Sequence, residues 1–491
     1  MAKHETRTPA PTPVATAEAA PELRRGLSLL DATMLVAGTM IGSGIFIVPA
    51  DMARNVGSPG WLLLVWIVTG ALTICGALTY GELAAAMPRA GGQYVFLREG
   101  LGRLPGFLYG WTLFVVIQTG TIAAVAVAFA RFLGVFFPAV SPEVGLSLGH
   151  VPMPGGEIEI GVSPQRLVAI AVIAILTLVN MRGLTAGRWV QNIFTIAKTG
   201  ALAGLVLLGL TIGRDPEAIA RNFTGMFDGA PTGIALVLAF GAAMVGSLFS
   251  SDAWHNVAFA GAEVRSPERN LARSMALGTA LVTVLYVLAN LAYLAVLPLA
   301  DIQTAPEDRV GTLAMQRIFG DSGLQLMAAA ILVSTFGCIN GLILSGARVY
   351  YAMARDGLFF ARAGRVSPRT HVPTWALGVQ GVWTAFLTLT GTYSQLLDYV
   401  IFAALLFYAL TASALFRLRF RRPDMPRPYR VVGYPFVPGL YMLATAGLAL
   451  VLLVARPVYT FSGLFLVLLG IPVYYLRRVR AAAPALEETA A

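Results

Sequence analysis

The sequence has few charged residues and very little cysteine, and both shortages restrict the class of protein. Charged residues make up 12% of the 491 residues and hydrophobic residues 57%, whereas an ordinary globular protein carries about twice that charged share. This number of charged residues is too small to cover the surface of a soluble protein, and most of the chain must therefore lie in lipid. The two cysteines, Cys75 and Cys338, lie within apolar runs, which excludes a disulfide-stapled scaffold and a cysteine-rich metal site.

Lysine is also scarce, although the net charge is +10. The chain has two lysines, Lys3 and Lys198, and neither follows a glycine. A Walker-type phosphate loop needs a Gly-Lys pair, so the chain does not bind ATP in that way. The arginines lie mostly between apolar runs rather than along one stripe, so we expect no nucleic-acid partner. No metal or cofactor is expected either.

Twelve apolar runs are long enough to cross a bilayer as helices, which takes about 20 mostly apolar residues each. We expect no strands of period two, and the runs are too long for a barrel, so the sequence predicts an all-α integral membrane protein. The expected spans are 29–54, 60–86, 104–137, 165–181, 189–212, 231–262, 271–298, 322–354, 373–391, 395–416, 435–455 and 459–476.

Arginine placement orients these spans. With the N-terminus inside, 25 basic residues fall in cytoplasmic segments and about seven in outer ones, as the positive-inside rule predicts. We therefore expect a multi-pass protein of the plasma (inner) membrane with both termini in the cytoplasm. Residues 1–28 are expected to be a disordered tail, and residues 477–491 a C-terminal tail.

The chain is expected to contain an internal repeat. Two blocks of five spans, residues 29–212 and 231–416, are nearly equal in length, and two further spans follow within 435–476. Because five is odd, the second copy would enter the membrane from the opposite side. The repeat is therefore expected to be inverted.

The first span of each block is interrupted by small or polar residues. Span one holds Gly42 and Gly44 within GTMIGSGIF, and span six holds Ser250, Ser251 and Asp252 within GSLFSSDAWHN. Paired interruptions of this kind point to a transporter's binding site. The alternative is that small residues only permit close helix packing.

Two broken helices would present backbone groups of both signs. Freed N–H groups at the start of an outer half-helix favour a carboxylate, and freed carbonyls at the ends of the preceding helical segments favour an ammonium group. A site with both suits the head group of an α-amino acid. The expected backbone contacts are Met40, Ile41, Gly42, Ser43, Gly44, Phe249 and Ser250.

Several motifs resemble a known family. The runs GTMIGSGIFIVPADMARNVGSPG, TYGELAAAMPRAGGQYVFLREGLG and STFGCINGLILSGARVYYAMARDG closely resemble the APC (amino acid–polyamine–organocation) superfamily. The chain is most similar to its L-type amino acid transporter branch and the bacterial relatives of that branch, over nearly all of residues 27–480. The resemblance implies the leucine-transporter fold of 12 transmembrane helices, with helices 1 and 6 discontinuous. It also implies alternating access and sodium-independent exchange or proton-coupled uptake of amino acids.

The resemblance also assigns substrate contacts. By position, Ile41, Ser43 and Gly44 would bind the substrate head group, Phe249 would form an aromatic lid, and Trp254 would be the aromatic of a Gly-Trp pair. In this chain an alanine replaces the glycine of that pair. The branch favours neutral amino acids as substrates.

Lys198 matches a lysine that takes the place of a sodium ion in sodium-independent relatives. Its ammonium would bridge span one and span eight, through Ser334, Thr335 or Cys338. Proton loss from a desolvated lysine could then couple transport to pH. A purely structural cation that locks the helices together is the alternative.

Asp252 and His255 depart from the family pattern. Asp252 would bind a cationic side chain, carry a coupling proton, or cap the following half-helix. Cationic amino acids or polyamines are therefore the alternative substrates. His255 would titrate near neutral pH or be a satisfied buried residue, and its i, i+3 spacing from Asp252 predicts a pair.

Other residues were assigned more general roles. Gln118, Thr119 and Asn340 would line the pocket or bond between helices, and Glu82 and Glu263 would organise the inner gate. Eukaryotic members of the L-type branch, which the chain resembles, have a cysteine between spans three and four that bonds to a heavy subunit. The loop 138–164 has no cysteine here, so the resemblance implies no disulfide-linked heavy subunit. An intramembrane enzyme is disfavoured, because four histidines and no HExxH or GxGD pattern provide no catalytic constellation.

Overall fold

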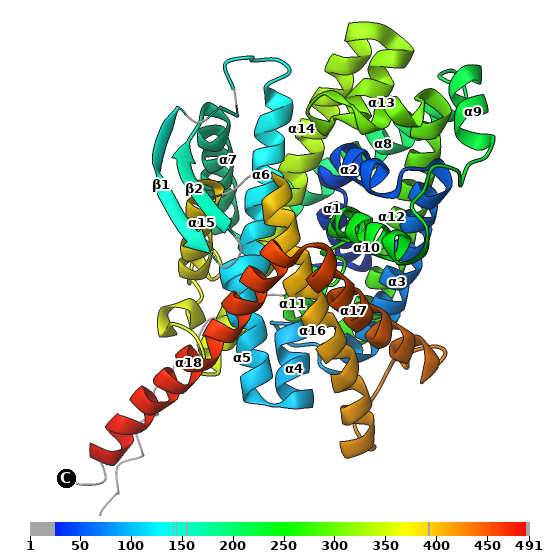
Figure 1. Ribbon diagram of the computed structural model, residues 1–491. Helices are drawn as coiled ribbons and strands as arrows, with labels where there is room; N and C mark the ends of the chain where they lie inside the picture. The colour runs from blue at the N-terminus through cyan, green and yellow to red at the C-terminus, as the bar shows by residue number, and fades with distance from the viewer. Residues whose placement is uncertain (1–24, 141, 144, 154–155, 391–392, 488–491) are drawn as a thin grey trace, which may run out of the picture.

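The computed structural model describes residues 25–140, 142–143, 145–153, 156–390 and 393–487. Within these residues the chain is nearly all helical (Figure 1), which confirms the expected fold class. The helices are α1 (Leu29–Met40), α2 (Gly44–Val56), α3 (Pro59–Ala86), α4 (Gln93–Leu101), α5 (Arg103–Thr112), α6 (Gln118–Leu133), α7 (Pro164–Met181), α8 (Leu184–Leu210), α9 (Pro216–Phe223), α10 (Gly233–Ser250), α11 (Asn256–Phe259), α12 (Pro267–Val296), α13 (Leu299–Gln303), α14 (Val310–Arg355), α15 (Thr374–Thr388), α16 (Tyr393–Arg421), α17 (Phe436–Ala455) and α18 (Pro457–Glu487).

Each of the twelve apolar runs coincides with a helix or a pair of helices. Among the described residues, nine helices are long and apolar enough to cross a membrane, and α1 with α2, bent by 40° at their junction, makes a tenth. The other two runs form shorter helices: α15 has 15 residues, and the apolar part of α18 is Thr460–Leu476. The inverted repeat remains a prediction.

Local sequence signals explain where several helices begin. Both α3 and α7 start at a Ser-Pro pair, in which the serine side chain accepts a hydrogen bond from a first-turn N–H group and the proline occupies the first helical position. Serine is a favoured N-cap, and proline lacks only an N–H group that has no helical partner there. A short π-helix, Leu113–Ile117, joins α5 to α6 within span three.

Spans one and six are interrupted, as expected. Residues 41–43 separate α1 from α2, and residues 251–255 separate α10 from α11. The second half of span six was expected to be helical to residue 262. Its α-helix, α11, has only four residues, and a 3-10 turn, Gly261–Glu263, follows it. Ala253 has a φ of 66°, a left-handed conformation that a continuous helix does not contain.

The expectation that the chain has no strands is wrong in the loop between α6 and α7. Strands β1 (Leu146–Met153) and β2 (Gly156–Val162) form an antiparallel hairpin, drawn beside α7 and α15 in Figure 1. The Gly161 N–H group donates to the Leu389 carbonyl at the end of α15, at 3.1 Å. The run GEIEIGV alternates with period two, a strand signal that a search for long apolar runs overlooks.

The boundary of the disordered N-terminal tail is also wrong. Residues 25–28 are part of the fold: the N–H groups of Gly26 and Leu27 both donate to the Glu263 carbonyl at 2.9 Å, and Leu27 is buried. Ser28 forms a capping box with Asp31 at the start of α1, which fixes where the helix begins. Residues 1–24 lie outside the described residues. At the other end, α18 continues through most of the expected C-terminal tail to Glu487.

Candidate functional site

A small cavity lies where the two interrupted helices meet. Its water-accessible volume is about 10 Å³, so the cavity is nearly closed in this conformation. Eight of the expected site residues are on its wall: Met40, Gly42, Ser43, Gly44, Phe249, Ser250, Asp252 and Cys338. Thr39, Thr121, Val125 and Ala253 complete it. The structure therefore brings most of the predicted site together from spans one, six and eight.

Glycine is required where the two breaks touch. A Cβ atom at Gly44 would collide with the Ser250 side chain, and one at Gly42 would lie 3.0 Å from the Cys338 sulfur. The first turn of α2, which begins at Gly44, thus lies directly against the last residue of α10. Close packing and interruption, proposed as alternatives, occur at the same glycines.

Some of the carbonyls expected to be free already have partners. The Ser334 hydroxyl on α14 lies 3.3 Å from the Ile41 carbonyl oxygen and 3.1 Å from that of Gly42. The Phe249 carbonyl accepts from the Asp252 N–H group at 3.2 Å. A carbonyl oxygen has two lone pairs, so the carbonyls of Ile41 and Gly42 each retain capacity for one further donor, whereas that of Phe249 also accepts from the Ser251 N–H group.

Sequence reasoning missed Tyr286 on α12. Its hydroxyl oxygen lies 2.9 Å from the Met40 carbonyl oxygen and 3.1 Å from that of Ser250. It therefore contacts the last carbonyl of α1 and the last carbonyl of α10 together. The Trp66 ring packs edge-on against it at 5.4 Å. A tyrosine in the middle of an apolar span is a usable signal, because a buried tyrosine hydroxyl usually finds a polar partner.

Lys198 on α8 forms the bridge that the resemblance implied. Its ammonium donates to the Gly38 carbonyl of α1 and lies 3.4 Å from the Ser334 carbonyl oxygen of α14. The Cys338 thiol donates to the Thr39 carbonyl at 3.1 Å. Thr335 does not take part, since its hydroxyl donates to Ile331 of its own helix at 2.8 Å. The coupling role of these residues remains a prediction.

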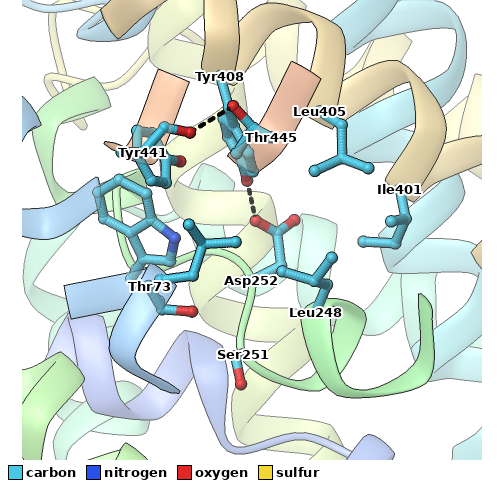
Figure 2. A pocket seen from close by; sticks show the side chains of 11 residues that line it. Thr73, Leu248, Ser251, Asp252, Ile401, Leu405, Tyr408, Tyr441 and Thr445 are labelled. Carbon is cyan, nitrogen blue, oxygen red and sulfur yellow. Dashed lines mark hydrogen bonds between the residues drawn. The ribbon is translucent and has the colours of Figure 1, made fainter. Parts of the chain in front are cut away.

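A second cavity adjoins the first and shares Asp252 with it. Its water-accessible volume is also about 10 Å³, and it lies between α3, α10, α16 and α17. Figure 2 shows the Asp252 carboxylate beside Leu248 and Ile401, with the Tyr408 hydroxyl directed at it. Tyr408 donates a hydrogen bond to this carboxylate. Trp254, expected at the head group, lines this second cavity instead.

Two expectations for this segment are wrong. Asp252 does not cap the following half-helix, because α11 begins only at Asn256, with His255 in the N-cap position. Asp252 and His255 do not pair either: the His255 Nδ1 atom has no hydrogen-bond partner among the described residues. The left-handed Ala253 turns the chain between them, so helical i, i+3 geometry does not apply. The His255 ring packs on Trp254 at 5.1 Å and Tyr408 at 5.5 Å.

Comparison with known proteins identifies the family. The model of the amino acid permease family matches residues 27–473. The chain belongs to this family. The resemblance to the APC superfamily is thereby confirmed.

Individual relatives of this permease are similar along most of their length. The b(0,+)-type amino acid transporter 1 of Mus musculus is 30% identical over 462 residues, which cover 92% of this chain and 88% of that protein. The large neutral amino acids transporter small subunit 2 of Homo sapiens is 32% identical over 467 residues, covering 92% and 80%. The serine/threonine exchanger SteT of Bacillus subtilis (strain 168) is 32% identical over 465 residues, covering 94% and 98%.

Three further polar residues of the permease bond within the protein. Gln118 donates to the Leu342 carbonyl at 2.8 Å, and Thr119 to a carbonyl of its own span at 2.7 Å. Asn340 accepts from Asn180 at 2.8 Å. For Gln118 and Asn340 the structure thus shows bonding between helices, and none of the three is on the wall of the first cavity.

Buried ion pairs lie at the face of the permease on which α1 begins, called the N-face below. Glu263 and Arg348 pair at 2.7 Å, and both side chains are 1% exposed. Glu82 accepts from Arg419 at 2.5 Å and from the Val431 N–H group at 2.7 Å. These contacts join span six to span eight, and span two to the end of span ten and the segment before span eleven. Their place agrees with the gate role expected for both glutamates, which remains a prediction.

Proposed function

We propose that this permease is a sodium-independent secondary transporter that exchanges neutral amino acids by alternating access. The observation that carries the proposal is the cavity wall, on which the start of α2 meets the ends of α1 and α10. The start of a helix carries partial positive charge and its end partial negative charge. An amino acid head group bears both charges on one carbon, and it fits this arrangement in one orientation.

The remaining wall favours a neutral side chain. Val125 and Phe249 contribute apolar surface next to the head-group ends. Two of the relatives are named for large neutral amino acids and for serine and threonine. We therefore infer neutral substrates for this permease as well.

Sodium independence rests on Lys198. Its ammonium binds carbonyls of α1 and α14, so a positive charge is already present where a coupling cation would have to bridge the same helices. Protons are the remaining candidate for coupling. We further propose plasma membrane location with both termini in the cytoplasm, and no disulfide-linked partner, since the loop 138–164 has no cysteine.

Transport of cationic amino acids or polyamines is the second candidate, and Asp252 favours it. Its side chain is buried on the wall of both cavities, and the bond from Tyr408 leaves further lone pairs on a carboxylate for a cation. The substitution Asp252→Asn separates the two candidates. Inhibition of leucine exchange by lysine and by putrescine should disappear in this variant if cations bind there, and neither should inhibit the wild type if the substrates are neutral.

The main test is exchange in liposomes. Purified permease is reconstituted in vesicles preloaded with unlabelled serine or leucine, and uptake of the labelled amino acid is measured with sodium or choline outside. We expect internal amino acid to stimulate uptake equally in both salts. Uptake that needs sodium would contradict sodium independence. Conductance without exchange would indicate a channel, and conversion of the amino acid would indicate an enzyme.

Adjacent residues on α14 provide a matched control. The Ser334 hydroxyl contacts the carbonyls at the break in span one, whereas the neighbouring Thr335 hydroxyl bonds only to its own helix. The substitution Ser334→Ala should raise the KM for exchange severalfold, since one interhelical hydrogen bond in a membrane contributes about 0.6–1.7 kcal/mol. The substitution Thr335→Ala should leave it unchanged. Equal effects would contradict this assignment of the head-group site.

A further inference from the structure

A larger hollow opens on the N-face, apart from the two cavities at the helix breaks. Its volume is about 660 Å³. Four arginines line it, Arg25, Arg89, Arg98 and Arg355, together with the single carboxylate of Asp356. They come from four separate segments: the residues before α1, the loop after α3, helix α4, and the end of α14.

Within the part of the chain that the structure describes, the positive charge of this basic hollow is largely uncompensated. Arg98 pairs with Asp356 and, at 2.9 Å, with Glu99. Glu99 also pairs with an arginine outside the hollow. Among the described residues, the side chains of Arg25, Arg89 and Arg355 have neither an ion pair nor a hydrogen bond. Three guanidinium groups therefore face the hollow without a counter-charge from the described residues.

We propose that the basic hollow binds a phosphate group. A guanidinium presents a planar fork of donors that matches phosphate oxygens in pairs. A phosphate monoester carries a charge of about −1.5 to −2 and three strong acceptor oxygens, whereas a carboxylate carries one charge and two oxygens. Three unpaired guanidinium groups match the phosphate better. The phosphate belongs either to a soluble compound or to a lipid headgroup, since both reach this face of a membrane protein.

The positive-inside rule alone does not explain why these four arginines surround one hollow. That rule requires arginines in the loops of one face, and Arg269 and Arg273 at the start of α12 satisfy it outside the hollow. The arginines of the hollow instead surround one concave space. A phosphate there would join the segment before α1 to the end of α14, so it would hold these two parts together. If the permease works by alternating access, as proposed above, bound phosphate slows its turnover. The binding itself does not depend on that function.

The test compares two double variants of the full-length protein. The variant Arg89→Gln/Arg355→Gln removes two unpaired charges of the hollow, and Arg269→Gln/Arg273→Gln removes the same charge elsewhere on the N-face. Neither arginine of the first pair bonds to another described side chain, so folding should be unaffected, and thermal unfolding without ligand checks this. Binding is measured at about 0.15 M salt, at which general surface attraction is largely screened beyond about 8 Å.

One arm of the test uses calorimetric titration with inorganic pyrophosphate, and the other uses the unfolding temperature in nanodiscs of phosphatidylcholine with and without phosphatidic acid. We expect one arm to show binding to the wild type and the control variant, with affinity at least about tenfold weaker in the hollow variant. The arm that responds identifies the source of the phosphate. Equal losses in both variants, or no binding in either arm, would overturn the proposal. If the wild type shows no amino acid exchange, the proposed function is refuted, and the phosphate-binding proposal is unaffected.

Discussion

The substitution Tyr286→Phe removes one hydroxyl group that contacts the ends of two broken helices. The ring can keep its place, because it packs against Trp66. The hydroxyl has one hydrogen and lies 2.9 Å from the Met40 carbonyl oxygen and 3.1 Å from that of Ser250, so it donates to one of them at a time. Each carbonyl keeps a lone pair for a substrate ammonium, and the hydroxyl holds the two carbonyls at a fixed spacing.

The expected loss follows from the strength of one hydrogen bond. Interhelical hydrogen bonds in membranes contribute about 0.6 kcal/mol on average and about 1.7 kcal/mol at most. A loss of about 1 kcal/mol in substrate binding corresponds to a rise of about fivefold in KM. The assay is exchange of a labelled neutral amino acid in liposomes over a range of external concentrations.

A matched control lies on the same helix. The Tyr293 hydroxyl donates to the Ile45 carbonyl within α2 at 3.3 Å, beyond the head-group ends. The substitution Tyr293→Phe should change KM less than Tyr286→Phe does. A KM for Tyr286→Phe equal to or below the wild-type value would refute the reasoning, because the hydroxyl would then either be irrelevant or compete with the substrate for the carbonyls.

Three other predictions concern transport by the Lys198 variant, the buried ion pair between Glu263 and Arg348, and the stability that Glu99 contributes at acid pH. The substitution Lys198→Ala removes the ammonium between α1 and α14, so exchange in liposomes should fall about tenfold or more and lose its pH dependence. Replacing Arg348 with methionine leaves Glu263 buried without its partner and should lower the free energy of unfolding by about 3–5 kcal/mol, measured by thermal unfolding. Burial raises the pKa of the Glu99 carboxyl, but its two arginine partners outweigh this and lower the pKa overall. The wild type should therefore be more stable than the Glu99→Gln variant above about pH 4.3 and lose that advantage as the pH falls through the lowered pKa.

Each of these predictions has a result that contradicts it. For Lys198 that result is wild-type kinetics at every pH. For the buried pair it is an unchanged unfolding temperature, and the double change of Glu263 and Arg348 to uncharged residues should recover part of the loss. For Glu99 it is a stability difference that does not vary with pH.

The spans could be predicted from the sequence because membrane helices are determined by local composition. Each apolar run is read without knowledge of its neighbours, and the Ser-Pro pairs at 58–59 and 163–164 mark helix starts directly. The hairpin at 146–162 also carries a local signal and was missed only because long runs were sought. The ordered residues 25–28 depend on Glu263, a partner that local pattern does not reveal.

The site was predictable only where backbone geometry alone defines it. Glycines 42 and 44 and the polar residues 250–252 indicate breaks in single helices, so their meeting could be inferred from the repeat. Tyr286 contacts a carbonyl 246 residues away in sequence, and such long-range contacts follow from packing. Whether Asp252 caps the following helix depends on where α11 begins, and helix boundaries are the least certain part of sequence reasoning.

The attachment of the chain's start to Glu263 has a mechanical consequence. Its carbonyl accepts from Gly26 and Leu27, the Leu27 carbonyl accepts from the Arg265 N–H group, and its carboxylate holds Arg348. Glu263 therefore connects the start of span one to the end of span six and to span eight. If the N-face opens during transport, these contacts favour joint movement of the first and sixth spans, and the ion pair between Glu263 and Arg348 would have to break for span eight to separate from them.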